Sequence, residues 1–273
     1  MHRVDSRDGT RIAFWRSGSG PAVLLVHGAT ADHTTTWRYV RPELERRFTV
    51  YAMDRRGRGG SGDSSSYDLQ REAEDVAAVA GSIGEPVGVV GHSYGALCAI
   101  EAALLTDNVR RLVLYEGVPL RGTELYAPGL IDHLGAMHAA GDMEAVLVAM
   151  YRDLVGMPPE EIELLRAQGD AWRVRLANVA TLPRELRAEE RYRFVPDRFR
   201  HMRASTLLVV GGDSHPRELA NATGVAAALP DARVVTLEGQ QHAAMYTAPD
   251  VFVREVVRFL NGKAGATYSP PRE

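Results

Sequence analysis

The sequence predicts an α/β protein built on a mostly parallel, doubly wound sheet with a helical insertion. Short apolar runs alternate with helical patterns over residues 1–119 and again over 203–262, as expected for parallel strands joined by helices. Several of these runs are apolar throughout, which is typical of strands covered on both faces. Over residues 120–202 the alternation stops and the pattern is helical. We therefore expect one core domain in two segments, with a helical cap inserted after the sixth strand.

The strands are predicted from short runs of apolar, largely β-branched residues that end at glycine or at a polar residue. The first run alternates like an edge strand, and a Ser- and Gly-rich turn follows it. The others are more continuously apolar. In chain order the predicted strands are Arg11–Trp15, Ala22–Val26, Phe48–Met53, Val87–Val90, Arg110–Tyr115, Thr206–Val210 and Arg233–Leu237.

The helices between these strands are predicted from apolar residues at helical spacing. Thr34, Thr35 and Thr36 offer caps for the first helix, and Gly84 and Pro86 end the second. The predicted helices outside the insertion are Trp37–Arg46, Leu69–Ile83, Ala96–Leu105, Glu218–Leu229 and Val251–Leu260. Residues 263–273 carry glycine, serine and two prolines, and we expect a flexible tail there.

Bulk composition excludes several classes of partner. The chain has 273 residues, of which 45% are hydrophobic and 25% charged, and its net charge is -3. This balance favours neither nucleic acid nor an anionic membrane as a partner. We read the arginines between Arg184 and Arg203, interleaved with acids, as a solvated helix face.

The N-terminus, the cysteine count and the spacing of the histidines give expectations about location, assembly and cofactors. The N-terminus is polar with no apolar signal region, so we expect a cytoplasmic protein. The oligomeric state stays open, with a homodimer among the options. One cysteine excludes an intramolecular disulfide, and nine scattered histidines show no metal-ligand spacing. We accordingly expect no metal and no cofactor.

The most informative stretch is Gly91-His92-Ser93-Tyr94-Gly95, which lies between an apolar strand and an apolar helix. A chain that turns this sharply from strand to helix holds one residue in a strained conformation, and the two glycines remove side chains that would collide there. Ser93 is then lifted clear of the sheet with its hydroxyl exposed. The amide of Tyr94 lies at the start of the helix, where it can stabilise negative charge.

A serine hydroxyl needs a base to become a nucleophile at neutral pH, and the base needs an orienting acid. The best candidate for the base is His242, in a loop between the last strand and the last helix. Two carboxylates follow strands at the same edge of the sheet, Glu116 and Asp213, and either could reach His242.

At this point the chain resembles an enzyme of the α/β-hydrolase fold over nearly its full length. The matching segments are His27-Gly28, Asp54-x-x-Gly57-x-Gly59-x-Ser61, Gly91-x-Ser93-x-Gly95 and Gly239-x-x-His242. The resemblance implies that Ser93 is the nucleophile, that the amides of Ala29 and Tyr94 form the oxyanion hole, and that residues 120–202 are the cap.

The acid of the triad is where this chain departs from the family. Most members carry it three residues past the glycine that here is Gly211, but Ser214 stands at that position and Asp213 is one residue early. Haloalkane dehalogenases and zearalenone-type lactonases are similar to this chain in placing a glutamate at the strand end of Glu116. We favour Glu116 and keep Asp213 as the alternative.

A serine at position 93 implies an acyl-enzyme, whereas the epoxide hydrolase and dehalogenase branches would require aspartate there. We expect a hydrolase for a carboxylic ester or lactone of a small to medium apolar molecule. A cofactor-free perhydrolase of the haloperoxidase kind and a carbon–carbon bond hydrolase would use the same triad, and a non-enzymatic binder is the third option. The candidate pocket residues are Gly28, His33, His92 and Trp172.

Overall fold

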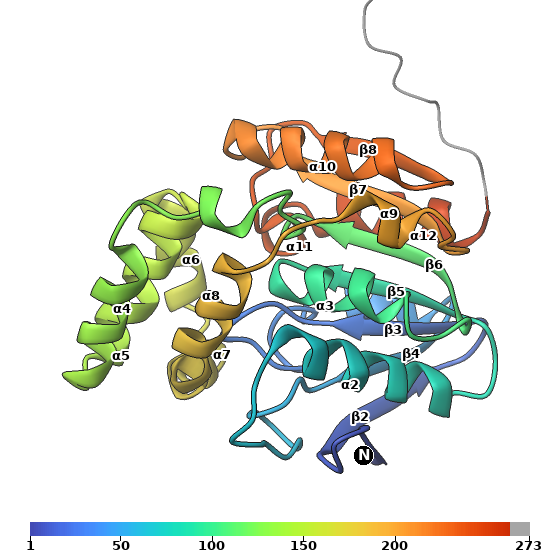
Figure 1. Cartoon of the computed structure of the whole chain (residues 1–273), viewed down its shortest axis with the longest axis horizontal. Coiled ribbons are helices and arrows are strands. Elements are labelled where there is room, and N and C mark those ends of the chain that lie inside the picture. Colours follow the sequence, from blue (N-terminus) through green and yellow to red (C-terminus); the bar gives the residue numbers. More distant parts are fainter. Residues whose placement is uncertain (263–273) are drawn as a thin grey trace, which may run out of the picture.

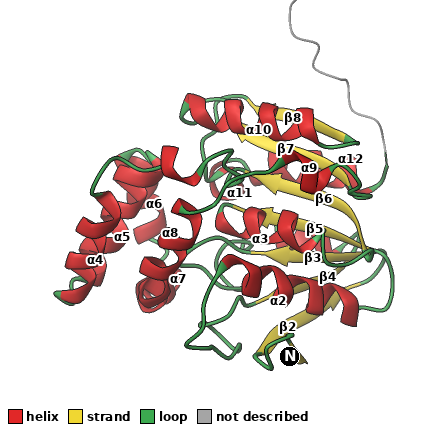
Figure 2. Cartoon of the chain, viewed as in Figure 1, coloured by secondary structure: helices red, strands yellow, loops and turns green. Residues whose placement is uncertain are grey.

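The computed structural model describes residues 1–262, and the predicted tail at 263–273 lies outside the described residues. Eight strands form one sheet in the order β1-β2-β4-β3-β5-β6-β7-β8 (Figures 1 and 2). The first three of these strands pair antiparallel and the remaining pairs are parallel. The strands are β1 His2–Asp5, β2 Arg11–Gly18, β3 Ala22–Val26, β4 Thr49–Met53, β5 Val87–His92, β6 Val109–Tyr115, β7 Ser205–Gly211 and β8 Ala232–Leu237.

Helices cover both faces of this sheet. The α-helices α2, α3, α9 and α10 pack on one face, and α1, α11 and α12 pack on the other (Figure 1). At the start of α2, the carboxylate of Asp68 accepts a hydrogen bond from the Arg71 amide, which satisfies a free N–H of the first turn. These helices are α1 Arg41–Glu45, α2 Leu69–Ser82, α3 Tyr94–Ala102, α9 Pro196–Phe199, α10 Pro216–Ala228, α11 Ala244–Thr247 and α12 Pro249–Leu260.

The core has two layers because successive side chains of a strand point to opposite faces. In β3, Leu24 belongs to the layer under α2 and α3, whereas Val23 and Leu25 belong to the layer under α1 and α12. All three side chains are almost fully buried. This explains why the central strands are apolar throughout rather than alternating.

The segment between β6 and β7 is helical and lies beyond the carboxyl ends of the parallel strands (Figures 1 and 2). It has its own apolar cluster, which includes Leu134, Leu147 and Val179. We therefore propose that 120–202 acts as a cap on a core formed by 1–119 and 203–262. Its elements are η1 Gly122–Glu124, α4 Leu130–Ala139, α5 Met143–Ala149, η2 Met150–Val155, α6 Pro159–Arg166, α7 Asp170–Ala177, η3 Asn178–Thr181 and α8 Leu182–Glu190. The helix α9 falls in the same range of residues but packs on the sheet.

Two sequence-based expectations about the N-terminal region are wrong. The run Arg11–Trp15 lies in β2, which is not an edge strand because β1 pairs with its outer side. The first helix is shorter than Trp37–Arg46 and begins at Arg41. The threonines do not cap it. Thr34 and Thr35 instead hydrogen-bond with Asp32 in a local turn, a competing arrangement that short polar side chains favour.

Within residues 1–262, no helix combines the length and the apolar character needed to cross a bilayer.

Candidate active site

Ser93 occupies a strained turn between β5 and α3. Its backbone has φ 53° and ψ −131°, a conformation that side chains rarely adopt. The two flanking glycines are required by close contacts. A Cβ on Gly95 would lie 2.4 Å from the Val26 carbonyl oxygen, and one on Gly91 would lie 2.7 Å from the Ala96 Cα. The predicted strand–turn–helix arrangement around Ser93 is therefore present.

Glu116 holds His242 at the same edge of the sheet. The Glu116 Oε2 and the His242 Nδ1 are 2.5 Å apart. The other carboxylate oxygen, Oε1, accepts hydrogen bonds from the Gly211 amide at 2.9 Å and from the Ser214 hydroxyl at 2.6 Å. The carboxylate is thus fixed by β7 on one side and faces the imidazole on the other.

Asp213, the alternative acid, forms no hydrogen bond or ion pair with His242, whose partner is Glu116. Its amide donates to the carbonyl of Gln240, and its side chain is exposed. Ser214, the residue after it, instead turns its hydroxyl toward Glu116. Ser214, at the position where the resemblance places the acid, therefore holds Glu116 through its hydroxyl.

Opposed effects set the charge state of this pair. Burial acts to raise the pKa of Glu116, but the bond to His242 and those from Ser214 and Gly211 outweigh it, so that this pKa is lowered. For His242, burial acts to lower the pKa, and the Glu116 carboxylate outweighs it, so that the pKa lies above its ordinary value. An imidazole held in this way presents its Nε2 as the atom that can accept a proton.

The loop around His242 is anchored from the core. The Tyr115 hydroxyl donates to the Gln241 carbonyl and accepts from the Ala244 amide. The His92 Nε2 donates to the carbonyl of His242 at 2.9 Å, and burial lowers the pKa of His92 so that its ring stays neutral. His92 and Tyr115 therefore position the base without competing with it for a proton.

Ser93 and His242 line one cavity between the sheet and the helical segment. Most of its wall is apolar. Of the predicted pocket residues, Gly28 and His92 lie in this wall. Among the described residues no hydrogen bond joins the Ser93 hydroxyl to the His242 ring, a contact that often tightens only when substrate binds.

The two amides expected to form the oxyanion hole border the same cavity. Ala29 follows the carboxyl end of β3, and Tyr94 is the first residue of α3. An amide in the first turn of a helix has no partner inside that helix. Neither N–H donates to another group within residues 1–262. Both donors are therefore available to an oxygen beside Ser93.

Comparison with known proteins decides the family. The sequence profile of the alpha/beta hydrolase family matches residues 23–255. A solved alpha/beta hydrolase from Sphaerobacter thermophilus is 33% identical, with a TM-score of 0.81 over 95% of this chain and 100% of that one. The chain belongs to the alpha/beta hydrolase family.

Other relatives span several hydrolase chemistries. A pimeloyl-[acyl-carrier protein] methyl ester esterase from Methylococcus capsulatus is 35% identical over 155 residues, which cover 55% of this chain and 59% of that protein. The enol-lactonase from Burkholderia xenovorans is 18% identical, with a TM-score of 0.76 over 95% of this chain and 100% of that one, and shares the fold. A curated relative from Mycobacterium bovis is 41% identical over 115 residues, and the chain spans about a third of its length, 32%.

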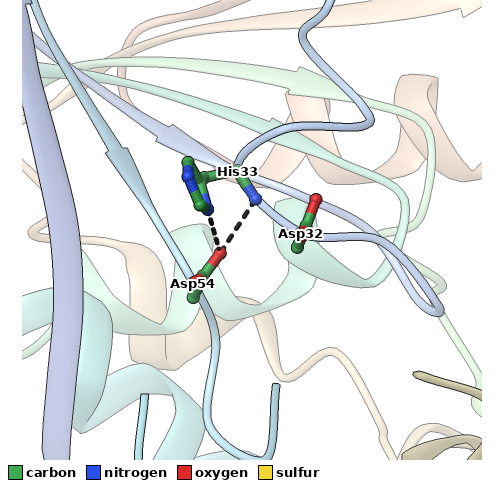
Figure 3. Close-up of side chains that lie close together, drawn as sticks. All are labelled: Asp32, His33 and Asp54. Atoms are coloured by element: carbon green, nitrogen blue, oxygen red, sulfur yellow. Dashed lines mark hydrogen bonds and ion pairs between the residues drawn. The ribbon is translucent and has the colours of Figure 1, made fainter. Parts of the chain in front are cut away.

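Two of the predicted pocket residues, Trp172 and His33, lie outside the cavity wall. Trp172 is packed inside the apolar cluster of the helical segment, where its indole N–H donates to Glu144, and it does not line the cavity. His33 is also outside the cavity wall. Its ring stacks on Trp15 with 3.5 Å between ring centres, and its Nδ1 lies 2.8 Å from the Asp54 Oδ1 (Figure 3). Both were predicted from residue type, which does not report what a side chain packs against.

Asp32, His33 and Asp54 lie close enough together to suggest a cation site (Figure 3). Their oxygens, however, already face donors. Asp54 accepts from the amides of His33 and Gly60, and Asp32 accepts from the Thr34 amide. Asp54 thus holds the His33 and Gly60 segments together, and we propose no metal ligand among the three.

The sequence predicts a solvated face for the arginine- and glutamate-rich helix α8, but two glutamates of this helix are buried. Glu185 is fully buried and pairs with Arg58 from the core, and Glu189 is buried and accepts from the Tyr126 hydroxyl. Arg55 is likewise buried and pairs with Glu72 at 2.6 Å. The pair of Arg58 and Glu185 joins the helical segment to the loop after β4. Glu185 and Glu189 have helical spacing, which is compatible with a shared buried face. Their charge nevertheless led to the prediction of a solvated face.

The cavity residues that were not predicted from the sequence include Arg175, Tyr151 and Tyr246. They come from α7, η2 and α11, so that no local motif unites them. Burial is what distinguishes them, and a single sequence does not reveal it for an arginine on a short helix.

Proposed function

We propose that the chain is a serine hydrolase that cleaves a carboxylic ester or lactone of a small to medium apolar molecule. The proposal rests chiefly on the 2.5 Å contact between Glu116 and His242, at the edge of the sheet where Ser93 projects from its strained turn. In the proposed roles, Ser93 is the nucleophile, His242 the general base and Glu116 the orienting acid.

The proposed reaction has two half-cycles. The His242 Nε2 takes the Ser93 proton as the serine oxygen attacks the carbonyl carbon, and the Ala29 and Tyr94 amides hold the resulting oxyanion. The carbon–oxygen bond of the ester then breaks, and His242 returns the proton to the leaving alcohol. Water attacks the acyl-enzyme in the same manner, the acid is released, and Ser93 regains its proton.

The cavity wall favours this substrate class. Aliphatic side chains such as Met150, Leu154 and Leu186 form much of it, which suits an apolar acyl or alcohol group. Two of the similar proteins are named as an esterase and a lactonase, which is the class of chemistry proposed here. A perhydrolase or a carbon–carbon bond hydrolase would use the same three residues, and substrate assays separate these reactions.

The direct test compares the wild type with Ser93→Ala, with Ser65→Ala as a matched control at an exposed serine. The wild type and the control should hydrolyse aryl acetates and a lactone panel, and a fluorophosphonate should label both. Ser93→Ala should lose both properties. Labelling that persists in Ser93→Ala would overturn the assignment. Preference for peroxide with acetate over every ester and lactone would indicate the perhydrolase instead. Preference for a vinylogous diketone would indicate the carbon–carbon bond hydrolase.

A further inference from the structure

Arg175 is a buried cation in the wall of the substrate cavity. Its residue is 5% exposed, and it projects from α7 into the space that Ser93 and His242 share. Within residues 1–262 no carboxylate forms an ion pair with it, and its hydrogen bonds go to two phenol groups. A guanidinium stays charged at any physiological pH, so a full positive charge lies at this wall.

The other buried arginines of the described chain are all paired with acids. Arg55 contacts Glu72 at 2.6 Å, Arg56 contacts Asp75 at 2.7 Å, and Arg58 contacts Glu185. Burying a charge without a counter-charge is costly, which explains these pairings. Arg175 is the exception to the pattern, and it is the one that lines the cavity.

The contacts of Arg175 leave donors free. Its two terminal nitrogens donate to the Tyr151 hydroxyl at 3.1 Å and to the Tyr246 hydroxyl at 2.5 Å. The Tyr246 hydroxyl donates its own hydrogen bond to the Thr35 carbonyl at 2.8 Å. Two of the five guanidinium N–H groups are therefore used, and the Tyr151 hydroxyl keeps its proton available.

We propose that Arg175 and Tyr151 form a subsite for a carboxylate that the substrate carries in addition to its scissile ester or lactone. This inference rests on the proposed function, because it places the subsite in the same cavity as Ser93. The substrate class is then an apolar ester or lactone with a free carboxylate at the end that contacts α7.

Chemistry favours a carboxylate over other occupants. The planar fork of a guanidinium matches the two oxygens of a carboxylate, and a phenol can add a third donor. The acids in the same wall do not oppose an anion strongly. Glu185 is neutralised by Arg58, and burial raises the pKa of Glu189 to about 7, so that it is largely protonated in mildly acidic solution.

The first experiment measures binding without turnover. The probes are 4-phenylbutyrate and its uncharged amide, titrated calorimetrically at pH 6.5 into wild type, Arg175→Gln, Arg175→Lys and Arg173→Gln. Arg173 is an exposed arginine on the same helix and serves as the matched control. A charge-assisted hydrogen bond corresponds to about a 10- to 100-fold change in affinity, so Arg175→Gln should lose about that factor for the acid and little for the amide. Arg175→Lys, which keeps the charge but not the fork, should lie between them.

The second experiment measures kcat/KM for a phenyl ester that carries a terminal carboxylate and for its carboxamide analogue. The wild type should prefer the acid, Arg175→Gln should lose that preference, and Arg173→Gln should keep it. Turnover of both esters without preference, together with equal binding of the two probes, would overturn the subsite and leave the proposed function intact. Selective binding of phenylbutyrate without turnover of any ester would do the reverse. A lowered melting temperature in Arg175→Gln alone identifies misfolding, and Arg175→Lys then decides.

Discussion

Replacing Glu116 by glutamine should change the tautomer of His242, so that its Nε2 can no longer accept the Ser93 proton. In the wild type, Oε1 accepts from the Gly211 amide and the Ser214 hydroxyl, and Oε2 faces the His242 Nδ1. The amide NH₂ of a glutamine would clash with the Gly211 N–H, so that its oxygen must stay on that side and its NH₂ must face His242. The imidazole would then accept at Nδ1 and carry its proton on Nε2, where it cannot take one from Ser93.

The expected loss is about 10⁴-fold in kcat, the order that a wrong imidazole tautomer produces in serine hydrolases, and this equals about 5.4 kcal/mol of transition-state stabilisation. The assay is single-turnover hydrolysis of an aryl acetate, with circular dichroism to verify folding. Asp213→Asn is the matched control, since its side chain is exposed, and it should keep full activity. If Glu116→Gln retained more than a tenth of the wild-type rate while Asp213→Asn lost most of it, the acid would be misassigned.

Three further predictions concern charge. Because Glu116 raises the pKa of His242, and only the neutral imidazole is a base, kcat/KM should rise with pH with a midpoint above 6.5; a midpoint below 6.5 would contradict this. Burial raises the pKa of Glu189 from 4.5 to about 7, so the folded wild type holds this proton more tightly than the unfolded chain and loses up to about 3 kcal/mol of stability as pH rises from 4.5 to 8. Glu189→Gln does not titrate, and denaturant unfolding should show it gaining on the wild type over that range, whereas a constant difference would refute the account. Glu185→Gln strands the buried Arg58 charge and should cost about 3 to 5 kcal/mol, measured by urea unfolding; a loss below 1 kcal/mol would show that water or another acid compensates.

Much of the fold follows from local pattern. The alternation of apolar runs with helical spacing is a property of each segment, and it predicted the parallel strands and the helices between them. Ser93 was predictable because its glycines form a local motif. Gly91 is required by contacts within the turn, whereas Gly95 is required by the close approach of the Val26 carbonyl of β3. Strand β1 was missed since its four residues are mostly exposed and gain their structure from pairing with β2.

Long-range packing explains the residues that sequence reasoning misplaced. His33 was a reasonable substrate contact by residue type, but Trp15 and Asp54 hold it away from the cavity. Trp172 looked suitable for a pocket and instead fills the interior of the helical segment. Arg175 attracted no notice because its importance lies in the absence of an acid around it, a property of three-dimensional surroundings rather than of a motif.

The most direct test of the serine mechanism is a crystal structure of the protein after reaction with a fluorophosphonate ester. We predict a phosphonyl group on the Ser93 oxygen, with its oxyanion about 2.7 to 3.1 Å from both the Ala29 and the Tyr94 amides and with His242 still held by Glu116. A phosphonyl group on any other residue, or an oxyanion that points away from both amides, would contradict the mechanism.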